Sequence, residues 1–333
     1  MDGWIKTGGK MNDLIRIVDQ FKNKKILVLG DVMLDKYIWG EVARISPEAP
    51  VQIVNVVKEE YVPGGASNVA ANIAELGAKV WMVGVVGNDE TRNKLIGEIA
   101  KKNINSDFLI SDPEKRTILK VRVFGRNQQL LRFDYEKKGD ISSSTEEKLL
   151  SSVKKIIREI DAIIISDYAK GTITKRLMEN LKRISGKSSM KIIVDPKPEH
   201  KEFYKNVTLI TPNTAEAKKM IGLSEEDEED IKVIGKTLLK ELNSNVLITR
   251  SEKGMSLFEK DGKTLNIPTF AKEVYDIIGA GDTSVAALAL ALASGASLEE
   301  SAIIANHAAG ITVGKVGTST VTAEELKRSI EDA

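Results

Sequence analysis

The 333-residue sequence has no cysteine and only two histidines, His200 and His307. The missing cysteine excludes disulfides, thiolate metal sites and a cysteine nucleophile, and two histidines are too few for most zinc sites. The chain also lacks an excess of either charge, since it has 49 basic and 48 acidic side chains. Proteins dedicated to nucleic acid carry a basic surplus, so we do not expect nucleic acid as a partner.

Long apolar runs are missing as well, and no segment resembles a signal peptide. We therefore expect a cytoplasmic protein that does not enter a membrane. Two catalytic signatures are also absent, the Gly-x-x-x-x-Gly-Lys-Ser/Thr of P-loop enzymes and the Gly-x-Ser-x-Gly of α/β-hydrolases. With 42% hydrophobic residues, however, the chain can bury the core of one large α/β domain or two smaller ones.

The most informative stretch is a glycine-rich segment that leads into an apolar helix. Gly279, Ala280 and Gly281 precede Asp282, and an apolar run follows from Thr283 to Ser294. Such a run predicts a buried helix, whose free N-terminal N–H groups and macrodipole attract anions. We also expect this helix end to keep the Asp282 carboxylate ionised. An anion hole beside a carboxylate base is what phosphoryl transfer to a hydroxyl requires.

The same residues have a simpler interpretation as a tight turn and a helix cap. Their spacing alone does not decide between the two, because short glycine motifs occur often by chance. A dinucleotide fingerprint fits less well, since its third glycine would fall at Ser284. The motif thus leaves the phosphate site and the plain turn open, and disfavours a nicotinamide-dependent oxidoreductase.

Strands and helices alternate along much of the chain, which predicts a parallel sheet with helices on both faces, an α/β fold. The expected strands are Ile26–Gly30, Lys79–Val86, Ala162–Ile165, Lys191–Val194, Thr208–Thr211 and Val246–Thr249. Polar groups follow several of them, at Asp31, Ser166-Asp167-Tyr168, Asp195-Pro196-Lys197, Thr211-Pro212-Asn213 and Thr249-Arg250-Ser251. Ligands of open α/β sheets bind beyond the carboxyl ends of the strands, so we predict the site there, although helix capping would explain some of these residues.

Two of these positions have a second possible role. Asn213 and Glu216 lie one helical turn apart, so they would hold Mg²⁺ through its water shell, or simply cap a helix. Lys197 would neutralise a phosphate, or be an ordinary surface lysine. An acidic run, Ser224–Asp230, is expected to form the solvated first turn of a helix.

Two further segments, Tyr37–Val57 and Arg116–Tyr135, alternate between apolar and polar residues. We interpret them as one small antiparallel sheet outside the main core, a lid formed by about residues 36–60 and 115–135. Because exposed sheet edges favour pairing, we predict a homodimer joined through the lids. Residues 1–23 are interpreted as an N-terminal extension and helix, with residues 1–10 disordered or added to the protein. The main domain then covers residues 24–325, and residues 326–333 form a C-terminal tail.

Three motifs together resemble the ribokinase-like (PfkB) carbohydrate kinases over residues 24–325. They are Gly64-Gly65 with Asn68, Asn213-x-x-Glu216, and Gly279-Ala-Gly-Asp282, in this order. The resemblance implies a Rossmann-like three-layer α/β/α sandwich with a small β-sheet lid. It also implies ATP and Mg²⁺, with a monovalent cation near the phosphate site. The family commonly has Thr where this chain has Ile278, and the lost hydroxyl affects how that cation or phosphate is held.

Further motifs resemble the heptose 7-phosphate kinases of ADP-heptose biosynthesis. They are Gly30–Asp35, Arg44–Pro50, Pro63–Ala70 and Arg126–Arg132. Those enzymes phosphorylate D-glycero-D-manno-heptose 7-phosphate at O1 to give the 1,7-bisphosphate, and many are fused to an adenylyltransferase. No His-x-Gly-His occurs in this chain. We therefore expect no adenylyltransferase domain here, and adenylylation by another protein.

The resemblance implies a role for each matched residue. Asp282 would be the base, and Gly279, Ala280 and Gly281 the anion hole. Sugar hydroxyls would be bound by Asp31, Asp35, Gly64, Gly65 and Asn68. Asn213 and Glu216 would organise Mg²⁺ and the ATP phosphates, with Asp195 as a further metal ligand, and Lys197 would lie between the two sites. The nucleotide would contact Thr249, Ser251, Gly254, Ala280, Asn306 and the segment near Ile277.

A phosphorylated sugar needs a second anion site, for which the lid offers arginines. Arg122, Arg126 and Arg132 have even spacing and would share one face of a strand, with Arg116 nearby. Guanidinium groups suit a phosphate, although a solvated or dimer-facing basic edge is the alternative. A kinase for ribose, fructose or a nucleoside would not need this cluster, and one for fructose 6-phosphate would. A binding protein without catalysis is the alternative of a different class, and the intact Gly-Ala-Gly-Asp argues against it.

Overall fold

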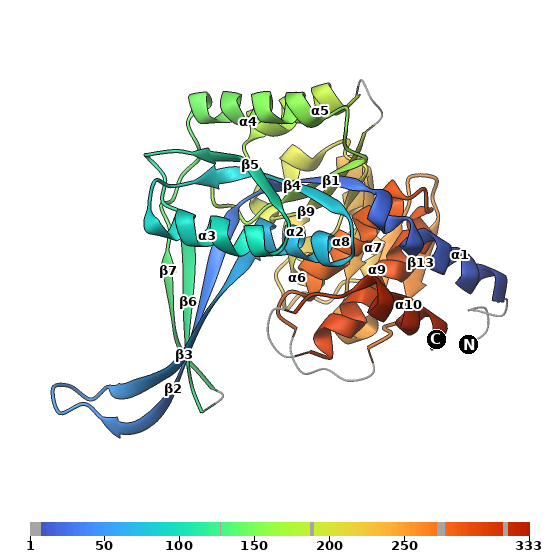
Figure 1. Cartoon of the computed structure of the whole chain (residues 1–333). Helices are drawn as coiled ribbons and strands as arrows, with labels where there is room; N and C mark the ends of the chain where they lie inside the picture. The colour runs from blue at the N-terminus through green and yellow to red at the C-terminus, as the bar shows by residue number, and fades with distance from the viewer. Residues whose placement is uncertain (1–7, 127, 187–189, 272–276, 316–318) are drawn as a thin grey trace.

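The computed structural model describes residues 8–126, 128–186, 190–271, 277–315 and 319–333. Within them the chain forms a nine-stranded sheet and a separate four-stranded sheet. Helices cover both faces of the larger sheet, and the smaller one projects away from it (Figure 1). The prediction for residues 1–10 falls mostly outside the described residues, but helix α1 (Gly8–Asp19) already begins within this range.

The larger sheet has the order β13-β12-β11-β10-β9-β8-β1-β4-β5. The strands are β1 (Lys25–Gly30), β4 (Lys79–Val86), β5 (Asn105–Ser111), β8 (Ala162–Ser166), β9 (Lys191–Asp195), β10 (Leu209–Ile210), β11 (Asn245–Thr249), β12 (Met255–Phe258) and β13 (Thr264–Ile267). All pairs from β11 to β5 are parallel, as predicted, and β12 and β13 add an antiparallel edge. Strands β5, β12 and β13 were not predicted from the sequence, because edge or four-residue strands lack a long apolar run.

Two layers of helices bury the two faces of this sheet. One layer contains α1, α2 (Ala66–Glu75), α3 (Glu90–Lys101), α8 (Ala280–Ala293), α9 (Leu298–Val313) and α10 (Ala323–Glu331). The other contains α4 (Ser143–Ile156), α5 (Lys175–Gly186), α6 (Thr214–Met220) and α7 (Ile231–Leu242). Neighbouring residues of β1 serve both layers, since Val28 packs into one core and Leu27 into the other. This arrangement is the predicted three-layer α/β/α sandwich.

The ends of the chain belong to the same core. Val18 of α1 and Leu326 of α10 are buried, and Lys327 forms an ion pair with Asp19 at 3.1 Å. Helix α10 runs through the predicted boundary at residue 325, so residues 326–333 are not a separate tail. Their apolar stripe needs the helix layer to cover it, which a sequence boundary does not reveal.

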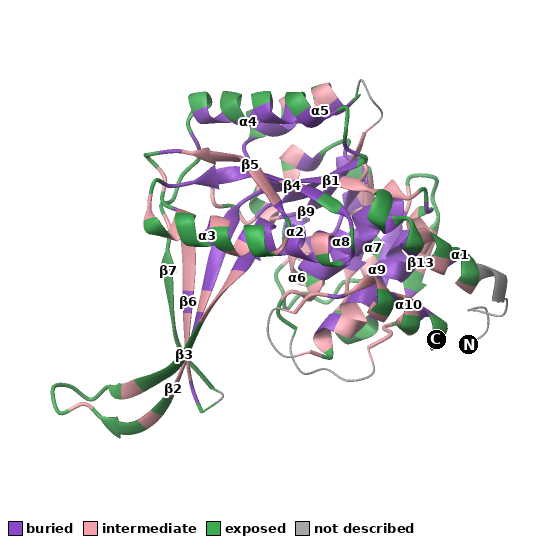
Figure 2. Cartoon of the chain, in the orientation of Figure 1, coloured by how far each residue is buried: buried purple, intermediate pink, exposed green. Residues whose placement is uncertain are grey.

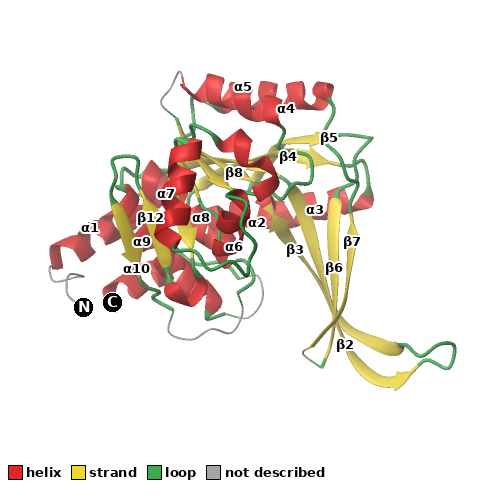
Figure 3. Cartoon of the chain, turned by 180° about the vertical axis from the view of Figure 1, so that it is seen from behind, coloured by secondary structure: helices red, strands yellow, loops and turns green. Residues whose placement is uncertain are grey.

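The four-stranded sheet, here called the lid, has the order β3-β2-β6-β7. Its strands are β2 (Val32–Ile45), β3 (Gln52–Gly65), β6 (Ile118–Gly125) and β7 (Gln128–Tyr135). The prediction of a purely antiparallel sheet is wrong, because β2 and β6 are parallel. Both strands leave the main domain in the same direction, since the chain returns to it through β4 and β5 before β6 begins (Figure 3).

The outer part of the lid is largely exposed (Figure 2). Several large apolar side chains on it face solvent: Ile45, Val51, Val56, Val57, Leu131, Phe133 and Tyr135. The acidic run also differs from its prediction, because residues 224–230 form the loop before α7 and only Asp230 caps that helix. Among the described helices, none combines the length and the hydropathy needed to cross a bilayer.

Candidate active site

A cavity of about 190 Å³ lies where strands β9 to β11 end and helix α8 begins. It is lined by Tyr168, Asp195, Lys197, Thr211, Asn213, Glu216, Thr249, Gly279, Gly281, Asp282 and Ser284. Eight of these were predicted site residues, contributed by separate segments of the chain. The structure therefore brings the proposed base, anion hole and metal ligands to one cavity at the expected edge of the sheet.

Helix α8 starts at this cavity with a glycine turn. Gly279 occupies the N-cap with φ +83°, in the left-handed region that favours glycine, and no described side chain caps the helix there. A Cβ placed on Gly281 would meet no atom within 4 Å. The glycine is therefore not needed for packing, and the first turn of the helix has open space beside its backbone. An anion would fit this space against the N–H groups of the turn, of which the Ala280 N–H donates to the Ile277 carbonyl at 3.4 Å.

The carboxylate of Asp282 is 9% exposed and has two side-chain donors. Asn68 Nδ2 donates to its Oδ2 at 2.6 Å, and the Tyr168 hydroxyl donates to its Oδ1 at 2.9 Å. Burial raises the pKa of Asp282 to about 6, although both hydrogen bonds lower it, while the charge of Asp35 raises it further. The helix end alone predicted an easily ionised group, but burial outweighs that effect. The carboxylate is still mainly ionised at neutral pH, and its pKa suits a general base.

Helix α2 holds Asn68 against the base. Asn72 Nδ2 donates to the Asn68 carbonyl at 2.9 Å, and Thr283 Oγ1 donates to Asn72 Oδ1 at 2.7 Å. The helix follows β3 directly through Gly65, at φ +53°, where a Cβ would come within 2.7 Å of the Asp31 carbonyl. Gly65 thus permits the sharp turn that places Asn68, and contributes no side chain of its own.

Two aspartates four residues apart have different surroundings. Asp31 is 1% exposed, and its carboxylate accepts the backbone N–H groups of Tyr168, Lys170 and Thr172 at 2.9–3.1 Å. Both oxygens accept hydrogen bonds, so Asp31 orders the loop after β8, and its binding of a sugar hydroxyl stays a prediction. Burial and the nearby Asp167 raise the pKa of Asp31.

Asp35, by contrast, lies on lid strand β2 and accepts a hydrogen bond from Arg122 Nη1 at 2.7 Å through its Oδ1. A Cβ on Gly64 would collide with the Asp35 carboxylate. The glycine therefore leaves the second carboxylate oxygen room for a hydroxyl. This geometry agrees with a sugar-binding role for Asp35 and a permissive role for Gly64.

The predicted metal residues form a more crowded group. Asn213 and Glu216 form a reciprocal capping box at the start of α6, and the other Glu216 oxygen pairs with Lys197 Nζ. Burial raises the pKa of Asp195 well above its usual range, and Asp282 and Glu216 raise it further against the lowering effect of Lys197. Burial lowers the pKa of Lys197, but Glu216 and Asp195 raise it to a net value above normal.

These residues fit a hydrated Mg²⁺ better than a closed metal site. No group of three or more His, Cys, Asp or Glu residues among the described residues is arranged to hold a metal. The cavity nevertheless has three carboxylates, on Asp195, Glu216 and Asp282, against a single lysine. A cation that keeps several waters and shares a phosphate would offset this negative charge.

The other residues predicted for the nucleotide site do not line this cavity. Gly254 forms a turn at φ +76°, where a Cβ would collide with the Ile267 carbonyl. Asn306 is buried and donates to the Pro268 carbonyl at 2.6 Å, so it fixes a loop. Ile277 is 73% exposed and Ile278 is 38% exposed, just before the glycine turn.

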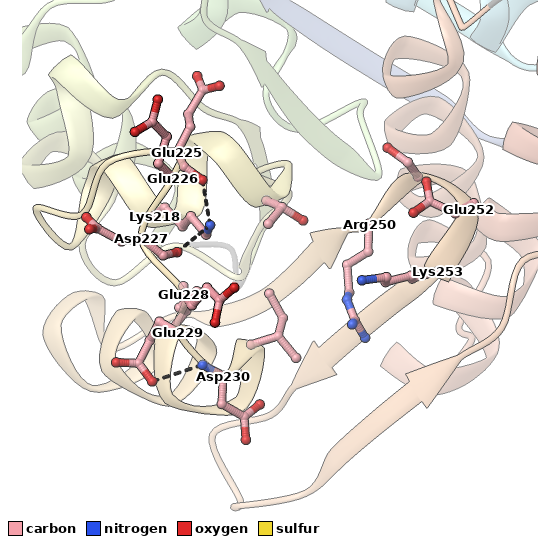
Figure 4. A pocket seen from close by; sticks show the side chains of 14 residues that line it. Lys218, Glu225, Glu226, Asp227, Glu228, Glu229, Asp230, Arg250, Glu252 and Lys253 are labelled. Carbon is pink, nitrogen blue, oxygen red and sulfur yellow. Dashed lines mark hydrogen bonds between the residues drawn. The ribbon is translucent and has the colours of Figure 1, made fainter.

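A larger cavity of about 720 Å³ has Thr214 among its lining residues (Figure 4). Ser251 lines it together with the acidic loop 225–230, and Lys218 donates to the backbone carbonyls of Glu225 and Asp227. Arg250 and Lys253 come from the opposite side. Six consecutive carboxylates thus line this cavity, with Lys218, Arg250 and Lys253 as the cations among its lining residues.

The lid arginines only partly follow their predicted arrangement. Arg122 and Arg132 lie directly opposite each other on β6 and β7, and therefore share a face. Arg126 is in the turn between these strands at φ +49°, so the prediction that it shares this face is wrong. Arg132 binds the Asp134 carboxylate through two nitrogens at 2.9 Å, and Arg116 lies over the Tyr135 ring.

Two side chains near the predicted site residues were not singled out in the sequence. Tyr168 was noted only as part of a polar strand end, yet its hydroxyl reaches Asp282. Lys120 pairs in register with Asp35 and Asp134, and it forms no ion pair among the described residues. Burial lowers the pKa of Lys120, and the nearby cations Lys170 and Arg132 lower it further. Asp134 and Asp35 raise it, but the net shift is downward. Only the strand register could reveal this cationic group.

Comparison with known proteins agrees with this geometry. Residues 23–325 match the model of the family described as "pfkB family carbohydrate kinase". The Bifunctional protein HldE of a Nitratiruptor species is 45% identical over 313 residues, 93% of this chain and 66% of that protein. HldE of Geobacter metallireducens is 44% identical over 301 residues, 90% of this chain and 61% of that protein. The chain thus spans somewhat less than two thirds of the length of these curated relatives.

Solved structures show the same fold. Phosphofructokinase-2 from Escherichia coli in complex with potassium has a TM-score of 0.76 and 18% identity, covering 93% of this chain and 98% of that one. A ribokinase from Arabidopsis thaliana complexed with ribose and ATP has a TM-score of 0.72 and 20% identity, covering 92% and 98%. The fold is therefore ribokinase-like, as the resemblance implied.

Proposed function

Because the chain belongs to the pfkB family of carbohydrate kinases and is a sugar kinase, we propose that it phosphorylates D-glycero-D-manno-heptose 7-phosphate. The γ-phosphoryl group of ATP is transferred to O1, giving the 1,7-bisphosphate and ADP. One observation carries the reaction class: the buried Asp282 carboxylate lies beside the open glycine turn of α8. The motif resemblance and the HldE relatives support the choice of sugar.

The reaction uses the residues of the small cavity. Asp282 accepts the proton of the O1 hydroxyl as the O1–Pγ bond forms and the bond from Pγ to the β-phosphate oxygen breaks. The N–H groups at Gly279, Ala280 and Gly281 stabilise the charge on the transferring phosphoryl group. Lys197 reaches the same cavity and adds a positive charge between donor and acceptor. Tyr168 and Asn68 keep Asp282 in place through their two hydrogen bonds.

Magnesium, when bound, neutralises charge on the ATP phosphates. We propose that Asn213, Glu216 and Asp195 hold it through water molecules. Thr249 lines the same cavity, and we assign Ser251, Gly254, Asn306 and Ile277 to the surrounding nucleotide site. Because Ile278 lacks a hydroxyl, its side chain would not contribute a ligand to a monovalent cation at this place.

The sugar lies between this cavity and the lid. Asp35 and Asn68 bind its hydroxyls, with Gly64 leaving room. Its phosphate binds a cationic group on the lid face that carries Asp35. Lys120 is the member of this group that has no ion pair among the described residues. Arg132 and Lys170 are its neighbours. Arg122 already pairs with Asp35, so we assign it to the sugar rather than to the phosphate.

The exposed apolar side chains of the lid support a homodimer formed through this sheet. Such a dimer would cover the edges and the outer face that the monomer leaves open (Figure 2). A kinase that uses ATP and a sugar phosphate is also expected to work in the cytoplasm, where both substrates are available.

The test is ADP release from Mg·ATP with a panel of sugars. The panel contains the heptose 7-phosphate, sedoheptulose 7-phosphate, fructose 6-phosphate, fructose and ribose, and Asp282→Asn is measured beside the wild type. Turnover of the heptose 7-phosphate alone, lost in the variant, is the expected result. Preference for fructose or ribose would overturn the phosphate site and leave a sugar kinase. Equal turnover by Asp282→Asn would overturn the assignment of the base.

A further inference from the structure

A polar cluster of two buried side chains and one partly buried histidine lies outside the lining of the small cavity. It consists of Asp167 at the end of β8 and of His200 and Tyr204 in the 3-10 segment Pro198–Tyr204. The Asp167 side chain is 0% exposed, and its Oδ2 accepts the Tyr204 hydroxyl at 2.7 Å and contacts His200 Nδ1 at 2.7 Å. None of the three lines the cavity, so the reaction described above does not use them directly.

The cluster joins the two loops that carry reacting side chains. On one side, Asp167 Oδ1 accepts the Ala169 N–H at 2.7 Å and so fixes the loop that carries Tyr168. On the other side, the Tyr204 hydroxyl accepts the Lys197 N–H at 3.0 Å. The Asp167 N–H also donates to the Asp195 carbonyl at 3.1 Å. A single carboxylate thus connects the residue that touches the base with the residue that reaches the phosphoryl site.

This arrangement is costly as a purely structural device. A buried carboxylate loses its hydration, and the ion-pair partner that Asp167 has among the described residues is a histidine, His200 at 2.7 Å, rather than a lysine or arginine. The loop it holds contains Ala169 at φ +53°, a left-handed conformation that is unfavourable for a residue with a Cβ. Apolar side chains would fill the same space at a lower cost in free energy. Strained backbone of this kind is found mainly at functional sites, where a particular geometry is needed.

We propose that Asp167, Tyr204 and His200 are positioning residues that set Lys197 against the transferring phosphoryl group and Tyr168 against Asp282. The proposal rests on the proposed roles of Lys197 and Asp282. Small displacements of such groups lower the rate of the chemical step much more than they weaken substrate binding. The cluster therefore acts on kcat through Lys197 and Tyr168.

The first test is Tyr204→Phe, which removes one hydroxyl and keeps the buried ring. We expect kcat to fall about tenfold, the effect of one lost hydrogen bond, while KM for ATP and for sugar stays within about twofold. Tyr61→Phe is the matched control, since it removes a hydroxyl of lid strand β3 that accepts a hydrogen bond from Lys94 of α3, and its kcat should be unchanged. A Tyr204→Phe enzyme with wild-type kcat would overturn the proposal.

A double-mutant cycle separates positioning from general destabilisation. In a Lys197→Ala background, Tyr204→Phe should cause much less than its tenfold loss, because the side chain that it positions is gone. The full tenfold loss in that background would contradict the proposal. His200→Asn retains a donor near Nδ1 and should keep more of the wild-type kcat than His200→Ala. Equal losses in these two variants would exclude His200 from the cluster.

Hydrogen exchange provides a readout that does not depend on the sugar. In Tyr204→Phe, amides of residues 167–172 and 195–204 should exchange faster, while those of β4 stay protected. If the heptose 7-phosphate is not turned over, kcat is measured with the best sugar of the panel, so the proposed substrate and the positioning cluster fail separately. Unchanged exchange in both loops would overturn the cluster whatever the substrate.

Discussion

The main sheet and the lid are both made of strands, but they differ in how far their residues are buried and in what their aspartates bind. Strand β8 is buried along its whole length, whereas β7 is exposed at nearly every position. Asp31 at the end of β1 uses its whole carboxylate on backbone N–H groups, and Asp35 in β2 binds Arg122 through one oxygen and leaves the other beside a glycine. In the proposed function, the buried sheet would supply rigid geometry for catalysis, and the lid would supply side chains for recognising the sugar.

The largest expected effect comes from the main domain. Asp282→Asn should lower kcat about a thousandfold, because the general base is lost, while KM for ATP changes little. Burial raises the pKa of Asp282 to about 6, above its unfolded value. The ionised carboxylate therefore destabilises the folded state above about pH 6. Asn carries no charge, so at pH 8 the variant should have a Tm no lower than that of the wild type. A lower Tm together with lost activity would instead indicate misfolding.

A lid change should affect binding rather than chemistry. Lys120→Ala is expected to raise KM for the sugar phosphate by about 10- to 100-fold, with a smaller change in kcat, because a charge-assisted hydrogen bond is lost. Arg126→Ala, in the exposed turn of the same sheet, is the matched control and should leave KM unaltered. Steady-state kinetics with varied sugar phosphate checks both variants. Equal increases in KM for the two variants would indicate that the phosphate site lies further out on the lid.

The proposed dimer gives a third contrast between the regions. Val57→Asp on the lid, where the side chain is 72% exposed, should convert a dimer to a monomer, since a buried unpaired charge is unfavourable. Val233→Asp on α7 of the main domain, 48% exposed, should leave the dimer intact. Light scattering at micromolar concentration measures the mass. A monomeric wild type would remove the lid dimer altogether.

The smallest effect concerns pH. The activity of the wild type should fall below about pH 6 as Asp282 becomes protonated. Tyr168→Phe removes a hydrogen bond that lowers this pKa, so the acid limb of kcat/KM should move to higher pH. Lys120→Ala should leave the limb in place. The substrate phosphate titrates identically with every enzyme, so differences between the enzymes report the base.

Local patterns were sufficient for the frame of the molecule. The apolar runs at Ile26–Gly30 and Ala162–Ile165 predicted buried parallel strands, and the run after Asp282 predicted a buried helix. These predictions succeeded because burial on both faces removes alternation from the sequence. Short or half-exposed strands such as β5 and β12 left no comparable pattern, so they were missed.

Pairing and burial were beyond the reach of local patterns. The sequence determined the glycine turn before Asp282, the polar strand ends and the family motifs, since each depends on neighbouring residues. Only the tertiary structure decided that β2 and β6 run parallel, that Asp31 holds a loop, and that Tyr168 reaches Asp282 from 114 residues away. Such contacts, and the desolvation that raises the pKa of Asp282, depend on which distant segments exclude water from the same place.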